Sequence, residues 1–248
     1  MRRRQTQSGM SLVEATIILL VLMLLTGVLA PSIFDYFRDA QSVKVKEDCE
    51  AIGVTVARLV RDVGSCLKLG NGPCTLDNRA DILYSDGPTV VPLSDAPPFN
   101  RPDQIYTTNW NDFSHASPMV SQFVTDRNPD GQIIYPDAAS TNPPAWNWPG
   151  PQFNLGWRGA YLSSPIGPDP WGNVYLVNSG FLAVARDAPY GTGIGRSHGG
   201  WPFDVFCLSA GMNGLFETPF NGTGRDWPPY GVERRGDDFI YVISGGTR

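Results

Sequence analysis

The feature that most constrains this chain is an apolar run near its N-terminus that is preceded by a carboxylate. Residues 15–30 contain no charged side chain, Glu14 stands directly before them, and Arg2, Arg3 and Arg4 precede both. Basic residues ahead of an apolar run place the N-terminus in the cytoplasm. The run is slightly short of the roughly 20 residues that a full span needs, yet it suits a helix that enters a membrane. We therefore predict a single-pass N-terminal helix.

Glu14 is the residue that an ordinary membrane segment does not explain. A carboxylate in the membrane costs about 2.5–3.5 kcal/mol, so it is normally retained for a partner. A secretory signal peptide or a plain anchor accounts for the apolar run but gives this side chain no partner. If the chain is cut after Gly9, Met10 becomes the new N-terminus, and its amine on a neighbouring subunit could neutralise Glu14. The carboxylate would then set the register between packed helices.

The segment SGMSLVEATIILLVLMLLTGVLAP resembles the N-terminal signal of type IV pilins and type II secretion pseudopilins. The shared features are a short basic leader, Gly9 before the cut, a glutamate at the fifth position after it, and a proline where Pro31 stands. Met10 replaces a commoner phenylalanine. The resemblance implies that a prepilin peptidase removes residues 1–9 and N-methylates Met10, and that residues 10–31 form the transmembrane and filament-core helix.

A second helical pattern follows Pro31. Apolar residues recur at spacings of three and four, which predicts one buried helical stripe; its members are Cys49, Ile52, Val56, Leu59, Val63 and Cys66. Asn71-Gly72-Pro73 is a helix-ending sequence, so residues 32–70 are assigned to an amphipathic helix that ends near residue 67. Together with the apolar run it would extend for roughly 85 Å at about 1.5 Å per residue.

Beyond the helix the sequence becomes loop-rich and then strand-rich. Residues 71–160 are rich in Pro, Asn, Asp and Trp, which predicts an insertion of long ordered loops with short strands. From 161 to 248, short apolar segments separated by turns predict a sheet domain, with VYLV, FLAVA, FDVFCLSA and DDFIYVIS as strands.

Three C-terminal segments resemble those of major pseudopilins: DPWGN (169–173), FDVFCLSAGMNGLFET (203–218) and GDDFIYV (236–242). The resemblance implies an α+β fold, in which one long N-terminal helix packs on a small antiparallel sheet with long loops. It also implies a calcium ion that holds the C-terminal loop.

Two loops are candidates for calcium, which takes six to eight oxygen ligands. In the C-terminal loop, the candidate side chains are Asn213, Thr218, Asp237 and Asp238, with carbonyls near Leu208 and Leu215. The family more usually has Asp where Asn213 stands, so one charge is missing. The second loop is DRNPDGQIIYPD, whose EF-hand-like ligand positions are Asp126, Asn128, Asp130 and Asp137. The alternative in both loops is a plain turn with solvated acids.

The chain has four cysteines, and an exported domain would meet an oxidising compartment. Cys49 and Cys66 lie on one predicted helix, roughly 25 Å apart by its rise, so they cannot pair. Pairing of Cys66 with Cys74 would close a short loop at the helix end, and Cys49 with Cys207 would tie the helix to the sheet. Free buried cysteines are the alternative.

Charge and motifs exclude two broad classes of function. The net charge of -5 gives no support for nucleic-acid binding. The chain has two histidines, His115 and His198, and no nucleophile elbow, phosphate-binding loop or zinc spacing, so no enzyme is expected.

The sequence therefore predicts a pseudopilin-like structural subunit of a type II secretion pseudopilus. The alternatives are a type IV pilus subunit and a membrane-anchored binding protein. The expected partners are other copies of the chain, minor pseudopilins, the prepilin peptidase and an inner-membrane assembly platform. The resemblance places the chain in the inner membrane by a single pass, with its C-terminal domain in the periplasm, before it joins a filament.

Overall fold

A computed structural model describes most of the 248 residues. The described residues are 11–64, 67–72, 78–86, 99–100, 107–108, 110, 113–135, 156–182, 204–220, 232 and 234–244. Five predicted site residues lie outside them: Gly9, Met10, Cys66, Cys74 and Asp137. The chain divides into two compact units, Met1–Lys44 and Val45–Arg248, and helix α1 (Leu12–Val63) contributes to both.

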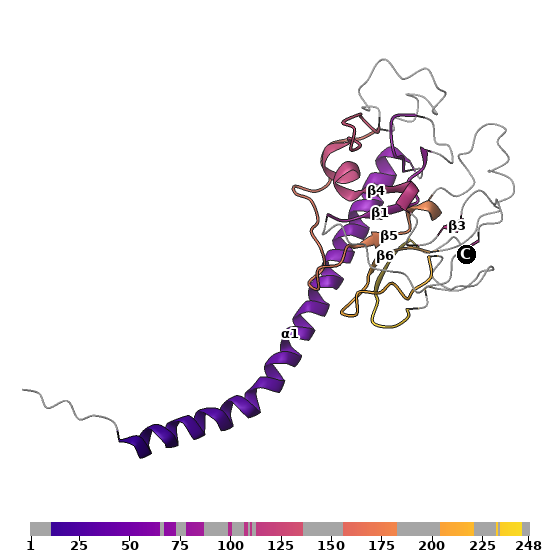
Figure 1. Cartoon of the computed structure of the whole chain (residues 1–248). Helices are drawn as coiled ribbons and strands as arrows, with labels where there is room; N and C mark the ends of the chain where they lie inside the picture. Colours follow the sequence, from indigo (N-terminus) through magenta and orange to yellow (C-terminus); the bar gives the residue numbers. More distant parts are fainter. Residues whose placement is uncertain are drawn as a thin grey trace, which may run out of the picture. The chain divides into compact units, whose positions relative to one another are not determined.

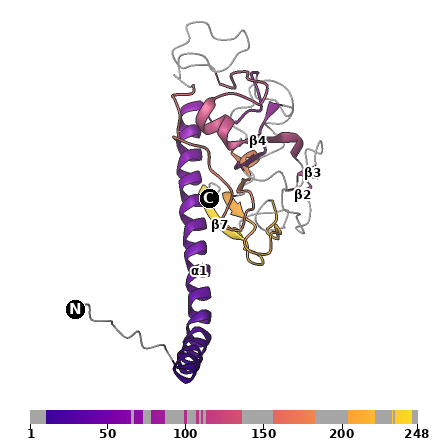
Figure 2. The same ribbon diagram turned by 60° about the vertical axis from the view of Figure 1, so that its left-hand side comes forward.

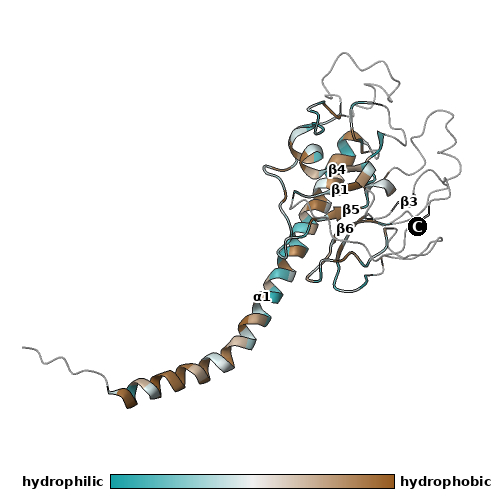
Figure 3. Cartoon of the chain, in the orientation of Figure 1, coloured by the Kyte–Doolittle hydropathy of each residue, from teal (hydrophilic) through white to brown (hydrophobic). Residues whose placement is uncertain are grey.

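In the first unit, α1 is apolar and exposed. It begins after Ser11, whose Oγ accepts a 3.2 Å hydrogen bond from the backbone N–H of Glu14. This Ser-x-x-Glu arrangement is half of a capping box, which explains where the helix starts. Exposed large apolar side chains run from Leu12 to Val43 in this unit. Figure 3, which colours the ribbon by hydropathy, shows the hydrophobic residues along this part of α1 in brown. Among the described residues, α1 is the one helix long and apolar enough to cross a membrane.

In the second unit, α1 buries one face. Five members of the predicted stripe are at most 1% exposed, which confirms it: Cys49, Ile52, Val56, Leu59 and Val63. Gly53 lies on the same side, where a Cβ would come within 2.7 Å of the Tyr241 ring, so only glycine permits this approach of helix to strand.

The helix ends earlier than the sequence analysis expected. α1 stops at Val63 rather than near residue 67. Gly64 has a φ of +91° and donates its N–H to the Val60 carbonyl at 2.9 Å. A glycine in the left-handed region with this bond is a common helix C-terminus, and it acts before Asn71-Gly72-Pro73 is reached.

The main sheet has five strands in the order β4-β1-β5-β6-β7 (Figures 1 and 2). Their bounds are β1 Ile82–Tyr84, β4 Ala116–Pro118, β5 Leu176–Val177, β6 Val205–Ser209 and β7 Phe239–Ser244. A separate pair joins β2 (Phe99–Asn100) to β3 (Thr107–Thr108) in antiparallel register. Short helical turns occupy Phe113–His115 (η2), Ser121–Thr125 (η3) and Ser179–Phe181 (η5).

The α+β class is confirmed, but the prediction of an antiparallel sheet is only partly right. Strands β5, β6 and β7 pair antiparallel, and β1 pairs antiparallel with β5. Strand β1, however, pairs parallel with β4, with Ile82 opposite Ala116. A parallel pair needs a long crossover, and residues 85–115 supply one. Both β1 and β4 come from the 71–160 segment, so the sheet is not confined to residues 161–248.

Strand β6 lies inside the core, with all five of its residues buried. An aromatic cluster packs beside it around Trp110, whose ring centroid lies 4.9 Å from that of Phe220 and 5.9 Å from that of Phe206. The indole N–H of Trp110 donates to the Thr218 carbonyl at 2.7 Å. The cluster therefore anchors the segment that follows β6.

Candidate functional site

The turn after β6 brings the predicted C-terminal site residues together. Gly211 has a φ of +64°, and its α-carbon lies so close to the Asp237 carbonyl that no side chain fits there. The backbone N–H of Asn213 donates to Asp237 Oδ2 at 2.9 Å. Asn213 Oδ1 accepts the Leu215 N–H at 2.7 Å, so this oxygen is already used within the turn.

Asp238 is fully buried beneath this turn. Its Oδ2 accepts N–H groups from Thr218 at 2.6 Å and from Glu217 at 3.0 Å. Burial raises the pKa of its carboxyl to about 6, against the opposing effect of the hydrogen bonds from Thr218 and Glu217. The other oxygen, Oδ1, makes no hydrogen bond within the described part of the chain, and neither does the buried Oδ1 of Asp237.

Glu217 is a third carboxylate at this loop that the sequence analysis did not propose. Its Oε2 accepts the side-chain N–H of Asn213 at 3.1 Å. Its carboxylate also occupies the space that a side chain at position 236 would fill, which Gly236 leaves open. Its position one residue before the proposed ligand Thr218 was the signal that could have identified it.

The turn after β6 gathers three acids, Glu217, Asp237 and Asp238. Two buried carboxylate oxygens without donors beside a third acid favour either a proton or a cation. Within the described residues, however, no three His, Cys, Asp or Glu side chains surround one point as metal ligands. Carbonyl and hydroxyl oxygens would have to complete a calcium shell, so calcium stays a prediction.

The DPWGN segment supports the same turn from its other side. Asp169 Oδ1 accepts N–H groups from Trp171 and Asn173, and Asp169 Oδ2 accepts the Ser209 hydroxyl at 2.7 Å. The side-chain amide of Asn173 donates to the Gly211 carbonyl at 2.9 Å. The segments that resemble pseudopilins are therefore neighbours in space.

We expect the melting temperature of the full-length chain in detergent to fall by several degrees when a chelator replaces calcium. A ligand that binds only the folded state stabilises it by about 2.7 kcal/mol at a hundredfold excess over its Kd. Asp238→Asn should abolish the difference between the two buffers. Asp130→Asn, an exposed acid of the second loop, is the matched control and should retain it. Equal melting temperatures in calcium and chelator would leave both loops as ordinary turns.

The second calcium candidate, the loop that begins at Asp126, uses its oxygens internally. Asp126 has a φ of +52°, and its Oδ1 accepts the Tyr135 N–H at 3.0 Å. Asn128 Oδ1 accepts the Gln132 N–H at 2.8 Å, whereas Asp130 is exposed. The described part of this loop is held as a turn by these bonds, which occupy Asp126 Oδ1 and Asn128 Oδ1.

Asp126 also affects the buried Lys68. Burial lowers the pKa of the Lys68 ammonium to about 8, and the charge of Asp126 partly opposes that shift. Lys68 Nζ donates to the Gly72 carbonyl at 3.2 Å and lies 5.2 Å from the centre of the Tyr135 ring. The contact between Lys68 and Tyr135 joins the chain segment after α1 to this loop.

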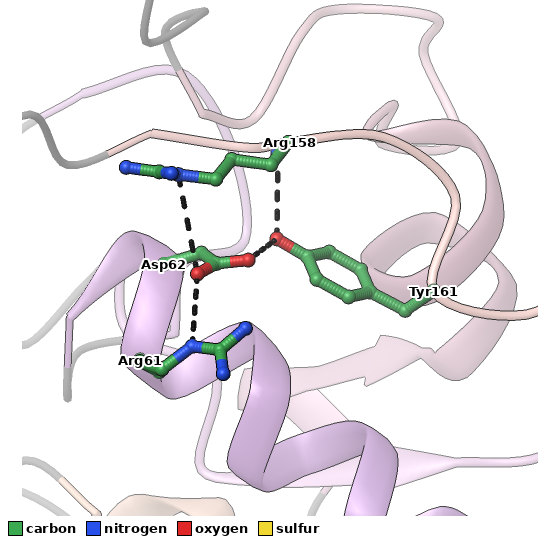
Figure 4. Close-up of polar contacts among 4 residues, drawn as sticks. All are labelled: Arg61, Asp62, Arg158 and Tyr161. Carbon is green, nitrogen blue, oxygen red and sulfur yellow. Dashed lines mark hydrogen bonds and ion pairs between the residues drawn. The ribbon is translucent and has the colours of Figure 1, made fainter.

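A polar cluster fixes the end of α1 to the segment around Tyr161 (Figure 4). Asp62 Oδ2 accepts the Tyr161 hydroxyl at 3.1 Å, and Asp62 Oδ1 lies 3.3 Å from Arg61 Nε and 4.0 Å from Arg158 Nε. Burial raises the pKa of Tyr161 to about 12. These contacts hold the end of α1 against the segment around Tyr161.

Of the predicted disulfide candidates, the structure describes Cys49 and Cys207. Their Sγ atoms lie 3.1 Å apart across the contact between α1 and β6, and both are free thiols. At the other end of the chain, Glu14 is exposed in the first turn of α1.

No family model, curated protein or solved structure matches this chain.

Proposed function

We propose that this chain is a pseudopilin-like structural subunit that a prepilin peptidase processes and that polymerises through its N-terminal helix. The observation that supports this most is the first unit of α1, where apolar side chains are exposed on all sides and Glu14 is the one acid before Asp35. Such a surface requires lipid or other apolar helices around it. The same helix continues into a buried, amphipathic half, as an assembling anchor would.

The carboxylate of Glu14 gives the helix packing its specificity. In lipid it costs about 2.5–3.5 kcal/mol. After removal of residues 1–9, the amine of Met10 on a neighbouring copy can pair with it in a medium where charges interact strongly. Assembly in the correct register then offsets the free-energy cost of the Glu14 carboxylate in lipid. In a shifted register, the carboxylate and the amine do not meet and the cost stays.

The choice of a type II secretion pseudopilus over a surface pilus depends on the C-terminal segments. The DPWGN turn holds the turn after β6, and that turn covers the acidic pair Asp237 and Asp238. This adjacency favours the pseudopilin hypothesis over a type IV pilus subunit or an anchored binding protein. The chain would stand in the inner membrane with its C-terminal domain in the periplasm, and assemble with minor pseudopilins on the inner-membrane platform.

The experiment is co-expression of the full chain with a prepilin peptidase. The wild-type chain should lose residues 1–9, and Gly9→Leu should block the cut and keep the chain out of sheared filaments. Gly27→Leu is the matched control: a Cβ at this glycine meets nothing within 4 Å, so cutting should proceed. Processing of Gly9→Leu at the wild-type rate would refute the assigned cut.

A further inference from the structure

Two buried sulfurs face each other across the contact between α1 and β6. Cys49 Sγ and Cys207 Sγ are 3.1 Å apart, although the two residues are 158 positions apart in the chain. Cys49 is 1% exposed and Cys207 is 0% exposed. Each sits on a regular element, so the approach is fixed by the backbone of the fold and not by a mobile loop.

The surroundings of the two sulfurs hold helix and sheet in this register. Cys49 belongs to the buried stripe of α1, and Cys207 stands opposite Tyr241 of β7 and Val177 of β5 in the sheet. One residue before Cys49, Asp48 Oδ2 accepts the Tyr175 hydroxyl at 3.0 Å. The contact is therefore flanked by independent interactions that hold α1 and β6 together.

Other roles for a close pair of cysteines fit this place less well. A redox-active dithiol needs an exposed thiolate of low pKa, but burial, together with the neighbouring Cys49, raises the pKa of the Cys207 thiol. A thiolate metal site needs further ligands, and among the described residues no group of three or more His, Cys, Asp or Glu is placed to supply them. A pair of reduced buried thiols and a static covalent link are the two roles that remain, and the 3.1 Å approach of the sulfurs favours the link.

We propose that Cys49 and Cys207 form a disulfide bond that joins the helix to the central strand in the mature protein. The reaction is thiol–disulfide exchange with a disulfide donor, such as an oxidised thiol–disulfide oxidoreductase. One thiolate attacks the donor to give a mixed disulfide, and the second thiolate displaces the donor thiol. Both protons and two electrons leave the cysteines, and the donor is reduced to two thiols.

Burial determines when the bond forms and how it behaves afterwards. Because the thiolate is the reactive form and neither sulfur meets solvent, the exchange takes place before α1 docks on the sheet. The finished bond is shielded from reductants in the same way. The disulfide proposal rests on the proposed function in one respect only, the compartment in which the bond forms, since export brings the chain to an oxidising environment.

The bond would have a mechanical consequence for a filament subunit. Without the bond, only noncovalent contacts would resist a force that slides α1 along β6 and β7. A covalent link closes a loop of 158 residues, which also removes conformational entropy from the unfolded chain.

The test traps the thiols of the exported full-length chain with acid, alkylates them without reduction, and maps the digest by mass spectrometry. We expect a linked pair of peptides that contain Cys49 and Cys207 and that separate after reduction. Alkylated Cys49 and Cys207 would overturn the proposal, and so would a link from either one to Cys66 or Cys74. The same digest shows the first residue of the chain, so a failed leader prediction is seen separately.

A melting experiment assigns the stabilisation to this pair. In the variant Cys66→Ser/Cys74→Ser, reduction should lower the melting temperature in detergent by roughly 10 °C. In the same background with Cys49→Ala/Cys207→Ala added, the reductant should have no effect. Chain made without export, unfolded and refolded with oxidised glutathione should form the same link. Refolded chain that keeps both thiols would refute the bond whatever the function of the protein.

Discussion

Replacing Trp110 by alanine should lower the free energy of unfolding by about 3–5 kcal/mol, the range for a fully buried aromatic side chain. Trp110 is 0% exposed and contacts the rings of Phe206, Phe216 and Phe220. The substitution leaves a cavity beside β6 and leaves the Thr218 carbonyl without its 2.7 Å donor. Urea denaturation of the full-length chain in detergent, followed by circular dichroism, measures the change.

Two variants separate the contributions at this position. Trp110→Phe keeps most of the packing but removes the indole N–H, so it should cost about 1–3 kcal/mol. Met212→Ala, at an exposed residue of the turn after β6, should change stability by less than about 0.5 kcal/mol. A loss under about 1 kcal/mol for Trp110→Ala would show that the 71–160 segment does not share the core.

Replacing Glu14 by alanine should leave membrane insertion intact and reduce filament assembly by on the order of 100-fold or more. Removing the carboxylate eases insertion, because it removes a polar group from lipid. In the assembled filament it leaves the amine of a neighbouring Met10 buried without its partner, which costs about 3–5 kcal/mol. The measurement compares membrane-extracted and sheared-filament fractions of the same cells by immunoblot.

The charge of Glu14 and the Ser11 cap at the start of α1 need separate controls. Glu14→Gln keeps a capping-box side chain but loses the charge, so it should assemble as poorly as Glu14→Ala. Ser11→Ala removes the 3.2 Å bond to the Glu14 N–H and should weaken only the helix start. Normal assembly of Glu14→Gln would show that assembly does not need the charge of Glu14.

The sequence predicted the parts of the fold whose signal is local. The stripe from Cys49 to Val63 was readable because a helix places every third or fourth residue on one face. Strands β5, β6 and β7 fell within predicted apolar segments. Short strands were expected in residues 71–160, but β1 and β4 were not located there, because each has only three residues and the parallel partner lies beyond a long crossover. Gly64 fell inside the predicted helix, whereas its positive φ places it at the helix end.

Only the part of the candidate site that lies in the C-terminal segments of the resemblance was predicted. The candidate ligands named there were Asn213, Thr218, Asp237 and Asp238, and the structure joins Asn213 to Asp237 and Thr218 to Asp238. Glu217 was not named, because the carboxylate reaches the acidic pair only through the space that Gly236 leaves open. The contact between Cys49 and Cys207 was one of several possible pairings until helix and strand were placed side by side.

The most direct test of the central claim is the N-terminal peptide of the chain extracted from membranes, identified by mass spectrometry. We expect a peptide that begins at Met10 and carries one methyl group on its α-amine. A peptide that keeps Met1 in assembled protein, or a chain that begins near Ala30 after an ordinary signal-peptide cut, would contradict it.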